Sequence, residues 1–412
     1  MTKRQNQADT AALQALQVER SLAKRTRKAH LVLLVLCGAL VLSLGVALCF
    51  MPHKDYSPTE KRTLAAPPEL SAQSLLEGDF MRDVSDFCAD QFPLRSYFVT
   101  LKARIELLLG KGQNNGVLQG KQGQLFTLPE LTDQTKQSLE QNVRSLQHLS
   151  QTLAEQGICL SVAIVPRAVD VNTHLLPDNF DADSLDLVWD WLRTAAGDTP
   201  MLLLQQTLRE QAAKGQPVWY KTDHHFTSLG AYYTYVALAD VLGYEPYPLT
   251  DFEIITVCED FYGTAYAASG MHWTQGDSIT LFRYEGDDRL QTRVIEGGQT
   301  LKTLQGLYDT QALTTQDQYE IFLGGTHTRI EVSDPDGAEL PTLVLLKDSF
   351  AQSVAPFLAR HYRLILLDPR TYKSAEASLP EAVLKEAPDS VLFLCGIDTL
   401  CEPGSLKSFS LH

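Results

Sequence analysis

Three adjacent residues near the middle of the chain carry side chains suited to acid–base chemistry. Asp223, His224 and His225 stand in the stretch VWYKTDHHFTSLGAYYTY, residues 218–235. Asp223 and His225 are two positions apart, so on an extended segment both side chains fall on the same side. A carboxylate so placed holds an imidazole in one tautomer and stabilises its protonated form, which a general base for a serine hydroxyl requires. The spacing is therefore compatible with half of a serine triad.

Two other interpretations of this stretch stay open from the residues alone. A zinc site needs a third ligand, and none of the further histidines stands at a recognised metal spacing from the pair: His272, His327 and His361. Alternatively, Thr227 or Ser228 caps a helix that begins there, and Asp223 and His224 are merely solvated.

A candidate nucleophile stands far along the chain. Ser349 follows the apolar stretch TLVLLK, residues 342–347, and precedes an amphipathic helical pattern. Reactive groups of open parallel sheets gather where strands end, and a helix start favours a developing oxyanion. Asp348 and Ser349 are also ordinary helix caps, so the KDSF stretch on its own is weak evidence for a catalytic serine.

A parallel sheet is the element that must position these residues. Apolar stretches rich in β-branched residues predict four buried strands, at residues 158–166, 342–347, 363–368 and 390–396. Helical patterns at residues 350–360 and 379–387 separate the last three, which is typical of a sheet with helices on its faces. Residues 251–332 are richer in Gly, Thr, Asp and Tyr and predict an inserted strand and loop region. The expected fold class is α/β, three layers around a mostly parallel sheet.

The N-terminal region predicts a membrane anchor. Residues 31–51 carry no charge over 21 positions, enough for a helix to cross the roughly 30 Å hydrocarbon core. Four basic residues in KRTRKAH precede this stretch, which places residues 1–30 in the cytoplasm and the chain beyond outside. A cleaved signal peptide is the alternative, but the basic region is long and no A-x-A-like site follows. Residues 52–75 are expected to be a linker to an extracytoplasmic domain, residues 76–412.

Charge and cysteine content restrict the partners. Residues 1–30 carry a net charge of +5, which leaves −20 for the rest of the chain. So acidic a domain argues against nucleic-acid partners and against lying on anionic lipid. Seven cysteines are present, without metal-ligand spacing, and only Cys395 and Cys401 are close enough in sequence to suggest a bridge. The domain must therefore fold on its core rather than on a disulfide framework.

Five segments together resemble the DHHW family, which is similar in turn to the SGNH-hydrolase-like domains of alginate O-acetyltransferases. The likeness runs from about Tyr56 to Gly396 and is carried by KTDHHFTSLGAYY, KDSFAQSVAPFL, DFYGTAYAASG, LLGKGQNNGVLQGKQGQL and FLGGTH. It implies an SGNH-hydrolase-like domain in which Asp223 orients the base, His225 is the base and Ser349 is the nucleophile.

The resemblance also suggests oxyanion or substrate contacts: Gly325, Thr326, Tyr262 and Phe226. Three positions depart from the family pattern. Phe226 stands where a tryptophan is expected, Lys347 replaces the glycine before the Asp-Ser pair, and Thr326 takes the place of an asparagine that would donate to an oxyanion.

The implied function is a single-pass cell-membrane O-acetyltransferase or esterase acting outside the cytoplasm on a cell-wall or secreted polysaccharide. Acetyl-CoA is cytoplasmic, so the resemblance implies a membrane-bound O-acyltransferase partner that exports the acyl group, and no cofactor. The alternative hypothesis is a non-catalytic polysaccharide-binding or assembly protein on a decayed hydrolase fold, which the changes at Lys347 and Thr326 favour.

Overall fold

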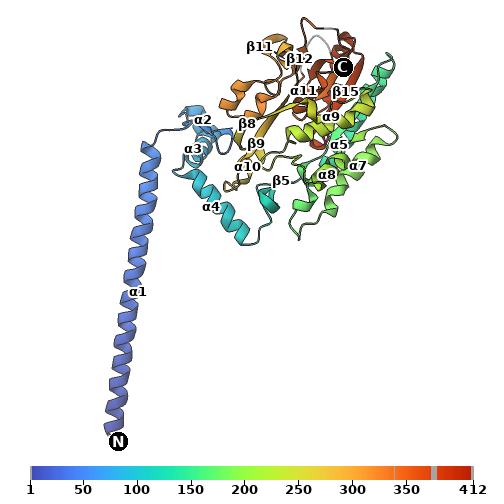
Figure 1. The fold of residues 1–412 in the computed structure, drawn as a ribbon. Coiled ribbons are helices and arrows are strands. Elements are labelled where there is room, and N and C mark those ends of the chain that lie inside the picture. Colours follow the sequence, from blue (N-terminus) through green and yellow to red (C-terminus); the bar gives the residue numbers. More distant parts are fainter. Residues whose placement is uncertain (1, 338, 373–377, 410–412) are drawn as a thin grey trace. The chain divides into compact units, whose positions relative to one another are not determined.

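The computed structural model describes residues 2–337, 339–372 and 378–409, with side chains from residue 25 onward except at residue 183 (Figure 1). The chain forms two compact units: Met1–Ser57 with Arg62–Val99, and Pro58–Lys61 with Thr100–His412. Met1 of the expected cytoplasmic tail and residues 410–412 of the expected external domain lie outside the described residues.

The first unit holds the apolar helix. α1 (Thr2–Phe50) contains a stretch, Arg25–Phe50, that is long and apolar enough to cross a membrane, with a mean hydropathy of 2.9. A two-stranded ladder follows, β1 (Tyr56–Ser57) with β2 (Arg62–Thr63), inside the segment expected to be a linker. Three helices follow: α2 (Ala72–Glu77), α3 (Asp79–Asp90) and α4 (Arg95–Leu108), of which Arg95–Val99 belong to this unit. α2 ends because Gly78 takes a left-handed conformation, φ 79°.

We expect protease added to intact protoplasts to remove the second unit from the cells. The reason is the uncharged span together with the basic residues before it, which orient the N-terminus inward. The measurement is an immunoblot with a C-terminal tag, with a cytoplasmic protein as the control for intact membranes. Full protection of the tag would contradict this orientation.

Eight strands of the second unit form the central sheet, in the order β11-β10-β12-β14-β13-β15-β6-β7. Five are parallel: β14 (Arg363–Leu367), β13 (Thr342–Lys347), β15 (Ser390–Gly396), β6 (Leu160–Val165) and β7 (Leu202–Leu203). Three antiparallel strands extend one edge: β12 (Arg329–Ser333), β10 (Gln291–Glu296) and β11 (Gln299–Gln305). All four buried strands predicted from the sequence are present. β13, which leads to Ser349, lies inside the parallel part, between β14 and β15.

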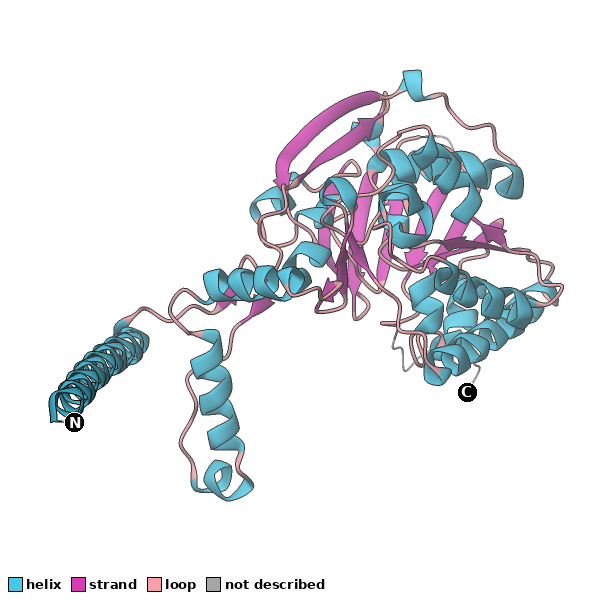
Figure 2. Ribbon diagram, turned by 90° about the horizontal axis from the view of Figure 1, so that it is seen from below, coloured by secondary structure: helices cyan, strands magenta, loops and turns pink. Residues whose placement is uncertain are grey.

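Helices cover both faces of the sheet, as Figure 2 shows with cyan helices around magenta strands. Side chains alternate along β13, so Leu343 and Leu345 join one buried cluster while Val344 and Leu346 join the other. The first cluster includes residues of α6 (Ala168–Val171), α8 (Gln205–Ala213), α9 (Ser228–Leu242) and α11 (Ala351–Leu358). The second includes residues of α5 (Asp133–Ala154), α7 (Asp186–Ala196), α12 (Leu379–Lys385) and α13 (Ile397–Cys401). The expected three-layer α/β fold is confirmed.

Two smaller sheets complete the second unit. β3 (Gln113–Asn114), β4 (Val117–Gln119) and β5 (Leu125–Thr127) form a three-stranded sheet. β8 (Glu253–Phe261) pairs with β9 (Asp277–Arg283), and α10 (Thr264–Ser269) lies between them in the chain. The region 251–332 thus supplies this hairpin and also the antiparallel edge of the central sheet.

The cysteine bridge that the sequence suggested is absent. Cys395 is buried on β15 and Cys401 ends α13, and both are free. Cys395 packs into the apolar core, where a free thiol behaves as a small apolar side chain.

Candidate active site

Ser349 lies in the turn between β13 and α11. It is the second residue after the strand, next to Asp348, and stands two residues before the helix begins. Asp348 holds this turn in place: one carboxylate oxygen accepts from the Phe350 N–H at 3.0 Å. Its other oxygen accepts from the Gly396 N–H at 2.6 Å and from the Thr399 hydroxyl at 2.7 Å. Asp348 is buried, and these contacts make it a support for Ser349 rather than a reacting group.

Asp223 and His225 are joined by two hydrogen bonds. Oδ1 of Asp223 accepts from the His225 N–H at 2.9 Å and pairs with His225 Nδ1 at 2.6 Å. Residues 221–225 form a bend, with the first of these bonds across it, and not the extended segment on which the two-residue spacing was considered. The predicted pairing of the two side chains is nevertheless present.

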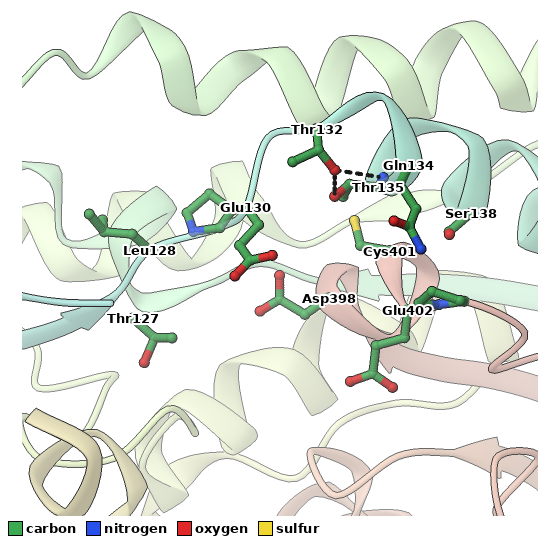
Figure 3. A pocket seen from close by; sticks show the side chains of 12 residues that line it. Thr127, Leu128, Glu130, Thr132, Gln134, Thr135, Ser138, Asp398, Cys401 and Glu402 are labelled. Carbon is green, nitrogen blue, oxygen red and sulfur yellow. Dashed lines mark hydrogen bonds between the residues drawn. The ribbon is translucent and has the colours of Figure 1, made fainter. Parts of the chain in front are cut away.

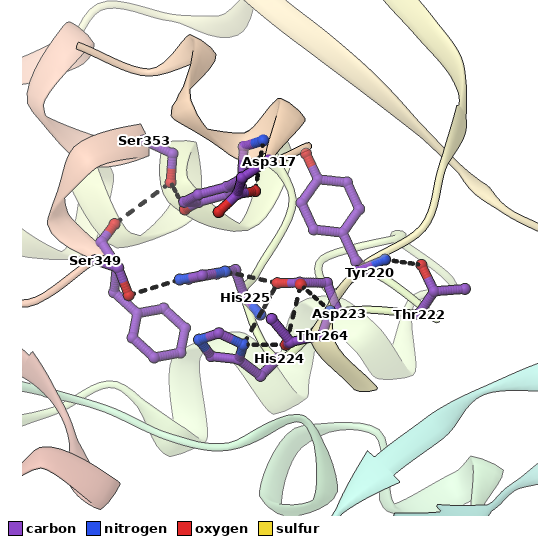
Figure 4. A network of polar contacts seen from close by, with 12 residues as sticks. Tyr220, Thr222, Asp223, His224, His225, Thr264, Asp317, Ser349 and Ser353 are labelled. Carbon is purple, nitrogen blue, oxygen red and sulfur yellow. Dashed lines mark hydrogen bonds and ion pairs between the residues drawn. The ribbon is translucent and has the colours of Figure 1, made fainter. Parts of the chain in front are cut away.

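His225 also reaches the serine. Its Nε2 lies 2.7 Å from the Ser349 hydroxyl, so Asp223, His225 and Ser349 form one hydrogen-bonded row (Figure 4). The imidazole stacks on Tyr319 of the turn η7 (Gln318–Ile321), with centroids 3.9 Å apart and planes 8° apart. The Phe350 ring packs edge-on against it at 5.0 Å. Buried walls on two sides therefore hold the ring in the one plane that joins both partners.

The second oxygen of Asp223 is bound by a loop that sequence reasoning did not assign to the site. Thr264 donates to it from its backbone N–H at 2.8 Å and from its hydroxyl at 3.2 Å. Gly263 lies so close that a Cβ there would overlap the carboxylate. Burial acts to raise the pKa of Asp223, but the neighbouring His224 and His225 and these donors outweigh it and hold the pKa well below its ordinary value. Asp223 is thus kept ionised.

His224 lies against His225 and not on the opposite side of the segment. The two ring centroids are 3.8 Å apart, because the turn folds the rings together. Its Nδ1 pairs with the Thr264 hydroxyl at 2.6 Å, and two-fifths of the side chain is exposed. Thr227 caps α9 by accepting from the Gly230 N–H, as one interpretation of the sequence expected. The helix cap at Thr227 is therefore present together with the hydrogen-bonded row of Asp223, His225 and Ser349.

Gly325 and Thr326, expected as oxyanion contacts, are held by α11. The Gly325 carbonyl accepts from the Gln352 side-chain amide, and Thr326 Oγ1 lies 3.5 Å from the Gln352 side-chain oxygen. The Gly325 N–H donates to the Phe322 carbonyl at 3.3 Å, and the oxyanion role of Gly325 and Thr326 stays a prediction. Gln352 connects the loop of Gly325 and Thr326 to α11, and the sequence did not point to it.

Phe226 and Tyr262 were expected to contact substrate. Phe226 is fully buried against Trp219 and Phe350, so it supports the site from within the core, which corrects the expectation. A tryptophan is larger and would need more room at this place. Tyr262 is half-buried and packs against Tyr266, with centroids 4.5 Å apart.

Metal binding is the other function that the spacing of Asp223, His224 and His225 would permit. One ligand atom each from Asp223, His224 and His225 lie within 4.8 Å of one another. However, both nitrogens of His225 already have partners, Asp223 and Ser349, and both oxygens of Asp223 accept hydrogen bonds. The arrangement of donors and acceptors favours the serine chemistry.

Lys347, which replaces a glycine of the family pattern, ends β13 two residues before Ser349 and is completely buried. Its ammonium has no hydrogen-bond partner among the described residues and lies 3.7 Å from Asp368. Asp368 is already paired with Arg370, at 3.0 and 2.7 Å. Burial lowers the pKa of Lys347, although Asp368 opposes the shift.

We therefore expect Lys347→Met to leave the thermal unfolding midpoint unchanged or to raise it. The substitution removes a buried, poorly paired ammonium and leaves Asp368 with its guanidinium partner. Thermal unfolding followed by circular dichroism measures this. A fall of more than about 4 °C would contradict it, since 1 kcal/mol shifts the midpoint of a domain this large by roughly 2–4 °C.

An open, mostly parallel sheet with Ser349 after a central strand, and with Asp223 and His225 brought to it from a distant bend, is the arrangement expected of an SGNH-hydrolase-like domain. Two family models match the chain: the SGNH hydrolase-like domain of the acetyltransferase AlgX over residues 117–276, and the DHHW protein over residues 204–367. The resemblance to the DHHW family and to the AlgX-type SGNH hydrolase-like domain is confirmed over these residues.

Relatives and solved structures agree with this class. Two proteins called probable alginate O-acetylase AlgJ match, from Pseudomonas putida (25% identity over 173 residues) and Pseudomonas aeruginosa (28% over 181 residues). Each match covers 41% of this chain, and it spans less than half of the relative, 45% and 44%. The fold matches a DHHW family protein from Eubacterium siraeum (TM-score 0.58, 17% identity, 72% of this chain and 95% of that one). It also matches Bacillus cereus PatB1 (TM-score 0.57, 18% identity, 72% and 99%).

Proposed function

We propose that this protein is a membrane-anchored O-acetyltransferase that acts outside the cytoplasm on a polysaccharide through Ser349, His225 and Asp223. The observation that carries the proposal is the continuous row from Asp223 through His225 to the Ser349 hydroxyl, with contacts of 2.6 and 2.7 Å. The matches to AlgX-like and AlgJ sequences support acetyl transfer to a polysaccharide as the reaction class.

The reaction takes place in two steps. Ser349 Oγ attacks the carbonyl carbon of an acetyl donor, while His225 Nε2 takes the hydroxyl proton and passes it to the leaving group. The product is an acetyl-serine. A sugar hydroxyl then gives its proton to His225 and attacks the same carbonyl carbon, and Ser349 recovers the proton as it leaves. Ionised Asp223 stabilises the imidazolium that forms in each step.

The apolar helix supports the proposed place of the reaction. With residues 31–51 as the anchor and residues 1–30 in the cytoplasm, the second unit works at the outer surface, where acetyl-CoA is absent. The donor is then an acetyl group exported by a membrane-bound O-acyltransferase partner. Water in place of the sugar hydroxyl would make the same row of residues an esterase.

The test uses the full-length protein in detergent with a phenyl acetate as donor and oligosaccharides as acceptors. We expect mass spectrometry to find acetyl groups on the oligosaccharide and, under rapid quenching, a 42 Da adduct on the peptide with Ser349. A serine-directed sulfonyl fluoride should label the same peptide. A folded protein that neither turns over the ester nor takes the label would refute the enzyme and favour a binding or assembly protein. Ester hydrolysis without any transfer would identify an esterase.

A further inference from the structure

A groove leads away from the candidate active site within the second unit. A small cavity of about 30 Å³ touches Asp223, His224 and Phe350, and its far side is lined by Thr127 and Asp398. The same two residues line a larger open pocket of about 380 Å³ (Figure 3). Because Thr127 and Asp398 line both cavities, the small cavity beside the active site adjoins the larger pocket at these two residues.

The walls of the pocket are fixed relative to the nucleophile. One wall is α13, and its Thr399 and the preceding Gly396 both donate to Asp348, the residue next to Ser349. The other wall is the start of α5, which Asn142 ties to α13 by donating to the carbonyls of Leu400 and Glu402 at 2.9 and 2.8 Å. A ligand in the pocket therefore meets a site that is already formed.

The pocket presents negative charge and no positive charge. Three of its lining residues are acids, Glu130, Asp398 and Glu402, and none is a lysine or an arginine. Glu130 and Glu402 are exposed, and neither has an ion-pair partner in the part of the chain that the structure describes. Asp398 forms no ion pair there at contact distance either, but it is attracted by the guanidinium of Arg167 in the adjoining cavity. Figure 3 shows the Glu130 and Asp398 carboxylates pointing toward each other. Such an arrangement repels anions and is stabilised by a cation between the carboxylates.

An unpaired donor in the small cavity points independently to a ligand. Arg167 is 6% exposed, and its Nε and Nη2 both donate to Asp170 at 2.8 Å. Its Nη1 is buried with no hydrogen-bond partner among the described residues. A buried donor without a partner is unfavourable by roughly 1–3 kcal/mol, so an acceptor oxygen from a ligand would satisfy it. Asp170 already balances the charge of Arg167, so a neutral hydroxyl or ring oxygen is sufficient.

We propose that this groove binds a polysaccharide acceptor that carries free amino groups, with a sugar oxygen on Arg167 and an ammonium group among Glu130, Asp398 and Glu402. Uronate and phosphate polymers are disfavoured by the same carboxylates. The inference rests on the proposed function, since it names the class of acceptor that the acetyl-serine meets.

The experiment measures binding to the full-length Ser349→Ala protein, in which no turnover interferes. Three ligands of equal length are compared by calorimetry at low salt: a glucosamine hexamer, its fully N-acetylated counterpart and a hexamer of a uronic acid. We expect the glucosamine hexamer to bind most tightly and the uronic-acid hexamer most weakly. Glu130→Gln and Glu402→Gln should each weaken the glucosamine hexamer about two- to fivefold and leave the N-acetylated one unchanged.

Glu245→Gln is the matched control, because Glu245 is exposed and does not line the pocket, so it should change nothing. Equal or tighter binding of the uronic-acid hexamer, or a glucosamine preference that survives both groove substitutions, overturns the inference. Labelling of Ser349 by the sulfonyl fluoride is followed in the wild-type protein. Labelling without a charge preference refutes the acceptor class alone, whereas a preference without labelling refutes the enzymatic function and leaves a binding groove.

Discussion

Ser349→Ala is expected to reduce turnover of an acetyl ester to the level of buffer. The hydroxyl is the only group of the polar row that can carry the acetyl group, because His225 and Asp223 serve to move and balance a proton. Without it there is no covalent route, and the loss should be at least about 10⁴-fold, comparable to removal of a nucleophile in known serine triads. Ester hydrolysis and acetyl transfer are both measured, with circular dichroism to show that the variant is folded.

Ser353→Ala is the control for the serine substitution. Ser353 lies four residues further along, on α11, and its hydroxyl lies 3.1 Å from the Tyr319 hydroxyl rather than near His225. This variant should keep its label with the sulfonyl fluoride and most of its activity. Residual turnover in Ser349→Ala, or loss of the label only in Ser353→Ala, would remove Ser349 from its proposed role.

His225→Ala and His224→Ala are expected to differ by orders of magnitude although the residues are neighbours. His225 alone lies between Asp223 and Ser349, and a positioned general base typically contributes 10²–10⁴-fold. His224 has a hydrogen bond to Thr264 and a stacking contact with His225. Its removal should cost about tenfold or less, through looser placement of the His225 ring.

The measurement is kcat/KM for the same ester, together with the rate of labelling at Ser349. His225→Ala should slow the labelling as well as the turnover, because the serine is then not activated. His224→Ala should label at nearly the wild-type rate. If His224 proves to be the essential histidine, the row seen in Figure 4 is not the catalytic one.

The sheet was predictable from the sequence because a strand buried on both faces must be apolar throughout. In the stretch TLVLLK, Leu343 packs in one cluster and Val344 in the other. Both faces of this strand are therefore apolar, and the sequence shows an unbroken apolar stretch. The place of Ser349 followed, since a polar residue directly after such a strand and before a helix lies at the edge of the sheet. Pairing it with His225, 124 positions earlier, required the family resemblance.

The parts of the site that escaped prediction depend on long-range packing. Tyr319 stacks on His225 from a short turn in a loop region, and a tyrosine there has no periodic pattern to mark it. The Gly263–Thr264 pair was visible within DFYGTAYAASG, but only the fold shows that it closes over Asp223. The bend at Asp223 was missed because a side-chain bond to the backbone competes with extended structure, and residue spacing does not record it.

Asp348 connects the turn that carries Ser349 to α13, and this connection affects which hydroxyl of a sugar is modified. Asp348 joins the nucleophile turn to Gly396 and Thr399 through a single buried carboxylate, so the distance from the serine to the wall formed by α13 is set by short hydrogen bonds and not by a hinge. A sugar chain anchored along that wall would present the same ring carbon to the acetyl-serine at every turnover. The modification would then fall on one hydroxyl of the repeating unit, so the protein would acetylate its polymer regioselectively.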